Sequence, residues 1–318
     1  MRQARKFICS TKPEVRGQKP EVRSQMSDVR CQRPSSIVLR PSSFVHRPSV
    51  LCLLSSILLA AAAGRQASSK DCIKIDEMIK EMLAARETQT QIQLLTKTYG
   101  SFSIEQAYQI QAALTKGLSK KLGSVAGYKV AFASKAAQEQ FGVDEPAGAP
   151  LFRLQRVPSG SKLPASSIME LTLETEIAFT IGKRLDRTIE NVQELKSYVK
   201  WVHTAFDIGD NPFVPGQEKP TPQDMIASGV GAHFHVLGPA VAPSEVDVDA
   251  LTLKLARNGT TVAESPATNV MGSPWNSLLW LANHVVKLGG ALEPGDVVIS
   301  GTAAPAYKVE GEKMKGDY

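Results

Sequence analysis

Two glutamates stand two residues apart in an otherwise apolar stretch, ELTLETEIAFTIG at residues 170–182. Because side chains on a β-strand alternate between its two faces, Glu174 and Glu176 would lie side by side on one face. Two neighbouring carboxylates repel each other, so water, a shared proton or a divalent cation must neutralise them. The apolar flanks argue against full exposure, since acids in such a run are rarely left unpaired.

A third acid helps to decide whether a shared proton or a cation neutralises the two glutamates. The stretch VHTAFDIGDNPF, residues 202–213, carries Asp207 and Asp210 where we expect a helix to end. Three carboxylates around open coordination positions suit Mg²⁺ or Mn²⁺, which prefer oxygen ligands and keep waters or substrate oxygens. Spacing alone leaves a metal site and an acid/base dyad open.

Other residues offer chemistry with weaker signals. His233 and His235 alternate on a predicted strand and would share a face, which suits a metal but is more often structural. His203, on a predicted helix face, could serve as a base, and His284 follows the apolar stripe of another helix. Lys129 lies in GYKV, a predicted strand, where a lone lysine ordinarily points to solvent.

Local patterns predict the elements that must position these residues. Ser103 and Gln106 form a capping box that starts a helix, and Gly123 ends it. Asn258-Gly259 marks the turn of a β-hairpin at residues 251–265. The other predicted elements are helices at 75–100, 134–142, 190–206 and 276–290, and strands at 127–134, 168–182, 233–238 and 296–301.

The order of these elements predicts the fold class. Helices dominate residues 73–125 and strands dominate residues 126–318, which indicates an α+β fold rather than a regular parallel βαβ series. We expect residues 71–318 to form one folded domain. The chain contains no G-x-G-x-x-G and no P-loop motif, so nucleotide binding is not expected.

Residues 1–70 differ from the rest of the 318-residue chain. They carry 13 of the 37 Lys and Arg residues and 3 of the 31 Asp and Glu residues, so the remainder has a net charge of −4. A basic surface for nucleic acid is therefore not expected. Seven-residue units such as KPEVRGQ and RPSSIVL repeat with a proline in nearly every unit, which excludes a coiled coil and predicts disorder. The repeat also resembles translated tandem DNA, which would place the true start downstream.

The apolar segment 50–64 is typical of a signal-peptide core and is too short to span a membrane, so we expect no stable membrane insertion. A cytoplasmic location is slightly favoured, with export through this segment as the alternative. All four cysteines precede residue 73, so residues 73–318 have no thiol nucleophile and no zinc-thiolate site.

We predict that residues 1–70 are dispensable, because their prolines stand at repeat spacing and no motif of the domain lies among them. A chain that begins near Ser69 should be soluble and should bind Mn²⁺ in a calorimetric titration as the full chain does. Aggregation or loss of metal binding would contradict this prediction.

Four segments, in order along the chain, resemble the 2-keto-4-pentenoate hydratase / 4-oxalocrotonate decarboxylase family of the fumarylacetoacetate hydrolase-like superfamily. They are GYKVAFASKAAQEQFGVDEP, the Glu-x-Glu strand, PWNSLLWLAN and LEPGDVVISGT, and the resemblance runs from about residue 75 to the end. It implies a mixed β-roll with N-terminal and peripheral helices. It also implies that Glu174, Glu176 and Asp207 hold Mg²⁺ or Mn²⁺, with Asp where a Glu is often found, and that Lys129 is the catalytic lysine.

The resemblance also implies a substrate and a reaction. Ser300, Gly301 and Thr302 match a turn whose backbone N–H groups would contact a substrate carboxylate. The implied reaction is hydration of a 2-hydroxypenta-2,4-dienoate, with decarboxylation, C–C hydrolysis or non-catalytic binding of a 2-oxo acid as alternatives. Ala147 and Ser228 stand where the family has acids, which indicates altered proton-transfer groups. We expect a small-molecule substrate and a homo-oligomer. Where family members usually continue with a last strand after GEKMKGDY, we expect either an unpaired sheet edge or a truncated gene model.

Overall fold

The computed structural model describes residues 69–216 and 218–309. The chain divides into two units between Gly64 and Arg65, and the second unit carries all the described residues. The predicted disorder and the signal-like segment of the leader lie outside the described residues. Within the described part, no helix is long and apolar enough to cross a membrane.

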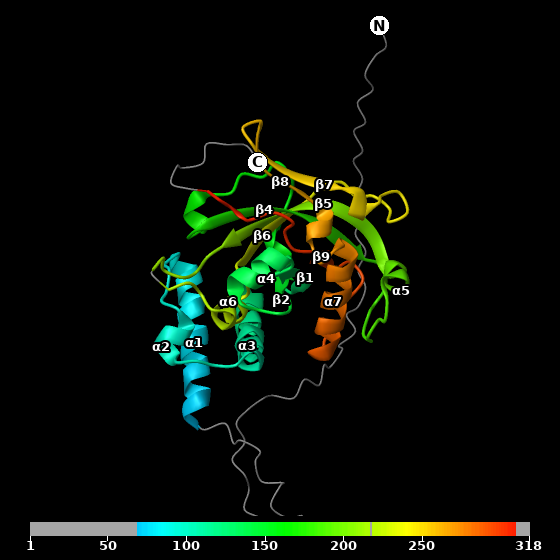
Figure 1. Cartoon of the computed structure of the whole chain (residues 1–318). Coiled ribbons are helices and arrows are strands. Elements are labelled where there is room, and N and C mark those ends of the chain that lie inside the picture. Colours follow the sequence, from blue (N-terminus) through cyan, green and yellow to red (C-terminus); the bar gives the residue numbers. More distant parts are fainter. Residues whose placement is uncertain (1–68, 217, 310–318) are drawn as a thin grey trace, which may run out of the picture. The chain divides into compact units, whose positions relative to one another are not determined.

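One mixed sheet of eight strands forms the centre of the second unit (Figure 1). The strands are β1 Val125–Ala131, β2 Ala147–Phe152, β3 Arg156–Val157, β4 Leu171–Ile181, β5 Val199–Asp210, β6 Ala232–Leu237, β9 Val297–Ile299 and β10 Tyr307–Lys308. Their order is β2-β1-β9-β4-β5-β6-β3, and β10 pairs with β4. Leu151 of β2 and Ala232 of β6 share one buried cluster although their strands lie near opposite ends of this order. The sheet therefore curls on itself, which confirms the predicted mixed β-roll.

Helices cover the roll from outside (Figure 1). Those of the N-terminal part pack with β2 in one apolar cluster. The last helix packs against β4, where the rings of Phe179 and Trp275 meet at a tilt of 41° with centroids 4.6 Å apart. The predicted capping box of Ser103 and Gln106 is confirmed. The helices are α1 Ser69–Thr88, α2 Leu95–Tyr99, α3 Ile104–Leu122, α4 Lys135–Phe141, α5 Val192–Lys196, α6 Pro222–Ser228 and α7 Pro274–Lys287.

The predicted hairpin is also present, as β7 Thr252–Arg257 and β8 Thr260–Pro266 in a separate two-stranded sheet. Asn258 and Gly259 have φ angles of 51° and 79°, as a type I′ turn requires at its two central residues. The local signal of an Asn-Gly pair between alternating strands was sufficient here.

The predicted helix at residues 190–206 is wrong over most of its length. Only Val192–Lys196 is helical, and the next residues form β5, which runs antiparallel between β4 and β6. The segment Val199–Val202 is rich in β-branched and aromatic residues, which fit a pleated surface. Pairing with two neighbouring strands outweighs the helix propensity of the Glu, Leu and Lys residues before it.

Sequence patterns did not predict four further elements: β2, β3, α6 and β10. Strand β10 pairs with Thr172 and Leu173 of β4. The unpaired sheet edge expected beyond residue 309 lies outside the described residues.

Candidate metal centre

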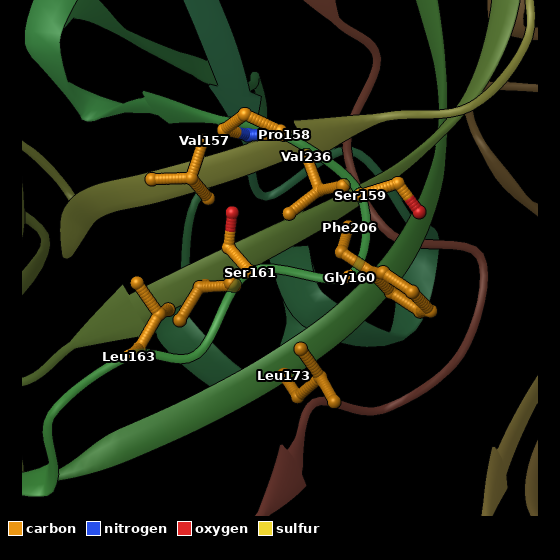
Figure 2. Close-up of a pocket in the computed structure, with 10 residues that line it drawn as sticks. Val157, Pro158, Ser159, Gly160, Ser161, Leu163, Leu173, Phe206 and Val236 are labelled. Atoms are coloured by element: carbon orange, nitrogen blue, oxygen red, sulfur yellow. The ribbon is translucent and has the colours of Figure 1, made fainter. Parts of the chain in front are cut away.

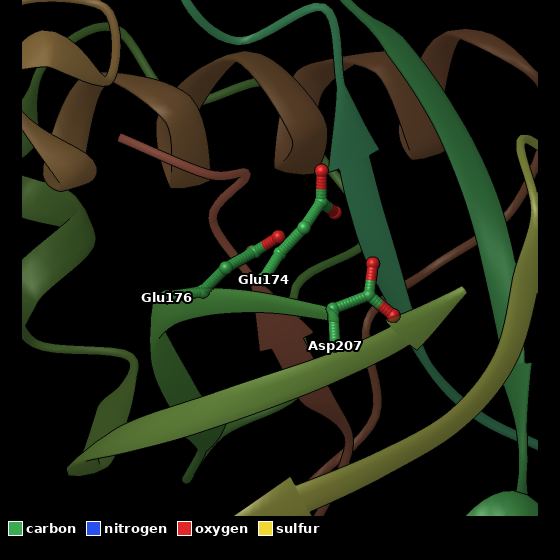
Figure 3. A group of neighbouring side chains, drawn as sticks. All are labelled: Glu174, Glu176 and Asp207. Carbon is green, nitrogen blue, oxygen red and sulfur yellow. The ribbon is translucent and has the colours of Figure 1, made fainter. Parts of the chain in front are cut away.

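Strands β4 and β5 bring Glu174, Glu176 and Asp207 together (Figure 3). The antiparallel register sets Glu174 directly opposite Asp207, and Glu176 follows two residues later on the same face. Each residue offers a carboxylate oxygen, and these oxygens all lie within 4.8 Å of one another. The third acid of this cluster is therefore part of a strand and not of a helix end.

Asp210, the alternative third acid, lies elsewhere. Its Oδ1 accepts hydrogen bonds from the backbone N–H groups of Met169 and Glu170, at 2.8 and 2.9 Å. This carboxylate holds the start of β4 against the end of β5. The third acid of the cluster is therefore Asp207 and not Asp210.

Burial gives the acid cluster unusual electrostatics. Burial raises the pKa of Glu174 to about 7, although the neighbouring Lys129 opposes the shift. Burial, followed by the nearby carboxylates of Asp207 and Glu174, raises the pKa of Glu176 well above its ordinary value. Oε1 of Glu176 and Oδ1 of Asp207 are buried without a hydrogen-bond partner among the described residues. Unpaired buried carboxylate oxygens are rare, so these two atoms are available to bind a ligand.

Lys129 lies inside this cluster instead of pointing to solvent. Its side chain extends from β1, is only 5% exposed, and forms an ion pair with Oδ2 of Asp207. Burial lowers the pKa of Lys129, but the three surrounding carboxylates outweigh this effect and leave it above its ordinary value. An ammonium is therefore held next to the acids.

The turn at Ser300, Gly301 and Thr302 adjoins the cluster. The backbone N–H of Gly301 donates to Oε2 of Glu176 at 2.5 Å, and that of Ser300 donates to the carbonyl of Ile177. Gly301 has a φ of +94°, and a Cβ added there would lie 2.3 Å from Cβ of Ala133. Only glycine fits this position, where it orients one carboxylate of the cluster. Contact of the turn with a substrate carboxylate stays a prediction.

The histidines fall into different environments. His203 lies on β5 rather than on a helix, and its ring bonds Oγ1 of Thr180 at 2.9 Å and the carbonyl of Gly238 at 3.0 Å, so it is structural. His284 stacks on Trp280 of α7, with ring centroids 4.7 Å apart.

The predicted pair of histidines on β6 does not act as a pair. His235 lies directly opposite Asp207, whereas the register between β5 and β6 shifts near His233. Burial lowers the pKa of both imidazoles. The charge of Arg86 adds to this shift at His233, whereas the charge of Asp207 opposes it at His235. The strict alternation of HFHV predicted a shared face, but the ladder is irregular at His233, and only His235 of the two stands opposite a residue of β5 in register.

The two positions that depart from the family pattern are buried. Ala147, at the start of β2, is 1% exposed and brings no ionisable group. Ser228 ends α6, where its hydroxyl donates to the carbonyl of Met225 and its own carbonyl accepts from Arg86. Neither residue supplies the acid that the resemblance led us to expect.

An apolar groove lies on the opposite face of the sheet (Figure 2). Leu173 of β4 and Phe206 and Ile208 of β5 line it, and each is next in sequence to an acid of the cluster. Because neighbouring residues on a strand face opposite ways, this groove is separate from the acid cluster.

The donor set fits a divalent cation. Three carboxylates close together, two of them with unpaired buried oxygens, form an oxygen-rich site of the kind that Mg²⁺ or Mn²⁺ occupies. A cation there would remove the repulsion between the acids and their desolvation penalty at once.

Comparisons with known proteins agree with this architecture. Residues 129–315 match the family model of the fumarylacetoacetate (FAA) hydrolase C-terminal domain. The chain is 27% identical over 236 residues to a 2-keto-4-pentenoate hydratase of Paraburkholderia xenovorans (strain LB400), which covers 74% of this chain and 87% of that protein. It is 26% identical over 214 residues to a 2-hydroxyhexa-2,4-dienoate hydratase of Comamonas testosteroni, over 66% and 80% of the two chains.

Among solved structures, the fold matches 4-oxalocrotonate decarboxylase from Pseudomonas putida G7, complexed with magnesium and adipate. The TM-score is 0.71 at 20% sequence identity, over 75% of this chain and 90% of that one. The matched share of both chains extends the similarity of fold beyond the sheet to the surrounding helices.

Proposed function

Since this chain belongs to the fumarylacetoacetate (FAA) hydrolase C-terminal family, we propose that it is a metal-dependent lyase for a small 2-oxo acid or its dienol. The reaction we favour is hydration of a 2-hydroxypenta-2,4-dienoate-type substrate. Two relatives that match most of the chain carry hydratase names, which supports a hydro-lyase.

One observation carries the proposal. Two fully buried carboxylate oxygens, on Glu176 and Asp207, have no protein partner among the described residues, and a buried ammonium stands beside them. A merely structural cluster would satisfy its own polar atoms. An incomplete cluster of acids with a proton donor at its side suits a cation and a substrate whose charge changes during reaction.

Each residue of the cluster then has a role. Glu174, Glu176 and Asp207 would hold Mg²⁺ or Mn²⁺, with Glu176 oriented by the N–H of Gly301. The chemistry supplied by a bound divalent cation is Lewis-acid stabilisation of the negative charge that develops on a 2-oxo acid when a proton leaves or reaches carbon. Lys129 holds a proton at Nζ and transfers it between carbon and oxygen of the substrate. Apolar residues of the roll, such as Ala178 and Ile299, exclude bulk water from these charges.

Decarboxylation is the second candidate, and one observation favours it. Ala147 brings no acid to the start of β2, so the site has fewer groups for proton transfer than the resemblance predicts. Loss of CO₂ uses the same stabilised charge and needs only one proton delivered to carbon, which Lys129 can supply.

Turnover separates these reactions. Purified protein with Mg²⁺ should consume 2-hydroxypenta-2,4-dienoate, seen as loss of its ultraviolet absorbance, and EDTA should stop the reaction. CO₂ release from 4-oxalocrotonate without hydration would favour the second candidate. Absence of both reactions in protein that binds Mg²⁺ would leave the non-catalytic binding of a 2-oxo acid.

Metal affinity should fall as the pH is lowered from about 8 to about 6. Burial raises the pKa of Glu174 to about 7, so below that pH the carboxyl holds a proton that must leave before a cation can bind. One such proton makes affinity about tenfold weaker at the lower pH. Calorimetric titration with Mn²⁺ at each pH, in buffers of different ionisation enthalpy, measures the affinity and the released proton together. An affinity independent of pH, with no proton released, would contradict the prediction.

A further inference from the structure

His235 of β6 and Asp207 of β5 face each other across two antiparallel strands. Residues directly opposite in such a pair project from the same face, with Cβ atoms about 4.5–5.5 Å apart. His235 is 2% exposed and Asp207 is 0% exposed, so the imidazole and the carboxylate meet in the interior of the roll. No role for this histidine follows from the proposed reaction.

The two side chains leave complementary atoms unpaired. Oδ2 of Asp207 is engaged by Lys129, but Oδ1 has no hydrogen-bond partner among the described residues, and neither has Nδ1 of His235. An imidazole nitrogen can donate and a carboxylate oxygen can only accept. A carboxylate oxygen also has two lone pairs, so Oδ1 can bind a cation and accept a hydrogen bond at the same time.

We propose that His235 is a positioning residue of the metal centre. When a cation binds the three acids, Nδ1–H of His235 turns to donate to Oδ1 of Asp207, a hydrogen bond that neither atom makes without the cation, and fixes that carboxylate. This inference rests on the proposed function, because it requires a cation at the three acids. Asp207 has the shortest side chain of the three ligands, and the ion pair with Lys129 engages its Oδ2. A hydrogen bond from the imidazole to the other oxygen would orient this carboxylate, as the N–H of Gly301 orients that of Glu176.

His235 acts through Asp207 and is not a fourth ligand. The set of potential ligand atoms that all lie within 4.8 Å of one another comprises Glu174, Glu176 and Asp207, without His235. Hydrogen-bond partners that orient metal ligands typically contribute about 10- to 100-fold to metal affinity.

His233 provides an internal control on the same strand. It stands two residues from His235, and burial lowers the pKa of both imidazoles to about 4, so both rings are neutral near pH 7. Nε2 of His233 is likewise buried without a partner among the described residues. Its neighbours are Phe234, with ring centroids 4.3 Å apart, and Arg86, so it is a buried histidine that does not face the acids.

The test compares three variants of the full chain by calorimetric titration with Mn²⁺. His235→Leu fills the space without a donor and should bind Mn²⁺ about 10- to 100-fold more weakly than the parent. His235→Asn places an amide N–H where Nδ1 stands and should stay within about threefold of the parent affinity. His233→Leu should bind as the parent does. Thermal unfolding of each metal-free variant verifies that it is folded.

Three results would overturn the role of His235, and a fourth would overturn the proposed function. Parental affinity in His235→Leu overturns the inference, and so does an equal loss in His235→Leu and His235→Asn, because packing and not the donor would then be responsible. A loss in His233→Leu as large as in His235→Leu also overturns it. If the parent binds no divalent cation, the proposed function itself fails.

Discussion

Glu174→Ala and Glu176→Ala are each expected to abolish Mn²⁺ binding while the fold survives. Each change removes one of three ligands, and the two carboxylates that remain bind a hard cation far more weakly. The metal-free fold should tolerate either change, because one buried negative charge and its repulsion disappear. Glu176→Ala also leaves the N–H of Gly301 without its acceptor, which costs about 1–3 kcal/mol of unfolding free energy.

Calorimetric titration with Mn²⁺ measures the loss, and two further variants interpret it. Glu176→Gln keeps an acceptor for Gly301 but not the charge, so it should be as stable as the parent and still lack tight metal binding. Glu264→Ala removes a half-exposed carboxylate that pairs with Lys254 on the hairpin, and it should bind Mn²⁺ normally. Parental titration of Mn²⁺ by Glu174→Ala or Glu176→Ala would refute the metal assignment.

Lys129→Met should keep metal binding and lower turnover by about 10²- to 10⁴-fold, the usual contribution of one positioned acid/base group. Methionine retains most of the buried stem, and what is lost is the proton at Nζ and the charge beside Asp207. Since the ammonium and a divalent cation are both attracted to the same carboxylates, its removal should leave Mn²⁺ affinity equal or higher.

Stability of this variant should depend on the metal. Breaking a buried ion pair leaves an uncompensated carboxylate and costs at most about 3–5 kcal/mol in the metal-free protein, less where the acids take up protons. Excess Mg²⁺ should restore much of the loss in thermal unfolding. Lys120→Met, on the exposed face of α3, is the control and should change neither property. Near-parental turnover of Lys129→Met would remove the proton-transfer role from this lysine.

Elements with strong local signals were predictable. The capping box of Ser103, the Asn-Gly turn and the glycine stop after α3 involve neighbours in sequence, and each appears as expected. The segment 190–206 failed because its residues are compatible with helix and strand alike. Hydrogen bonding to β4 and β6, which local propensity does not contain, settles it as the strand β5.

In the candidate site too, some features follow from local sequence and others depend on the pairing of strands. That Glu174 and Glu176 share a face follows from strand alternation alone, because a period of two is a local property of the backbone. That Asp207 is the third acid depends on the register of β5 against β4, and a slip of one residue would turn it to the opposite face.

Lys129 and His235 depend on still longer contacts. Lys129 comes from β1, which is separated from β4 by β9, and it reaches Asp207 only because the sheet curls. His235 stands opposite Asp207 because β6 pairs with β5, whereas His233 falls at an irregularity in that ladder. Residue type and spacing state which groups can bind a cation or move a proton. Hydrogen bonding and packing between strands far apart in the chain determine which of these groups meet. That pairing cannot be predicted from the residues next to each group.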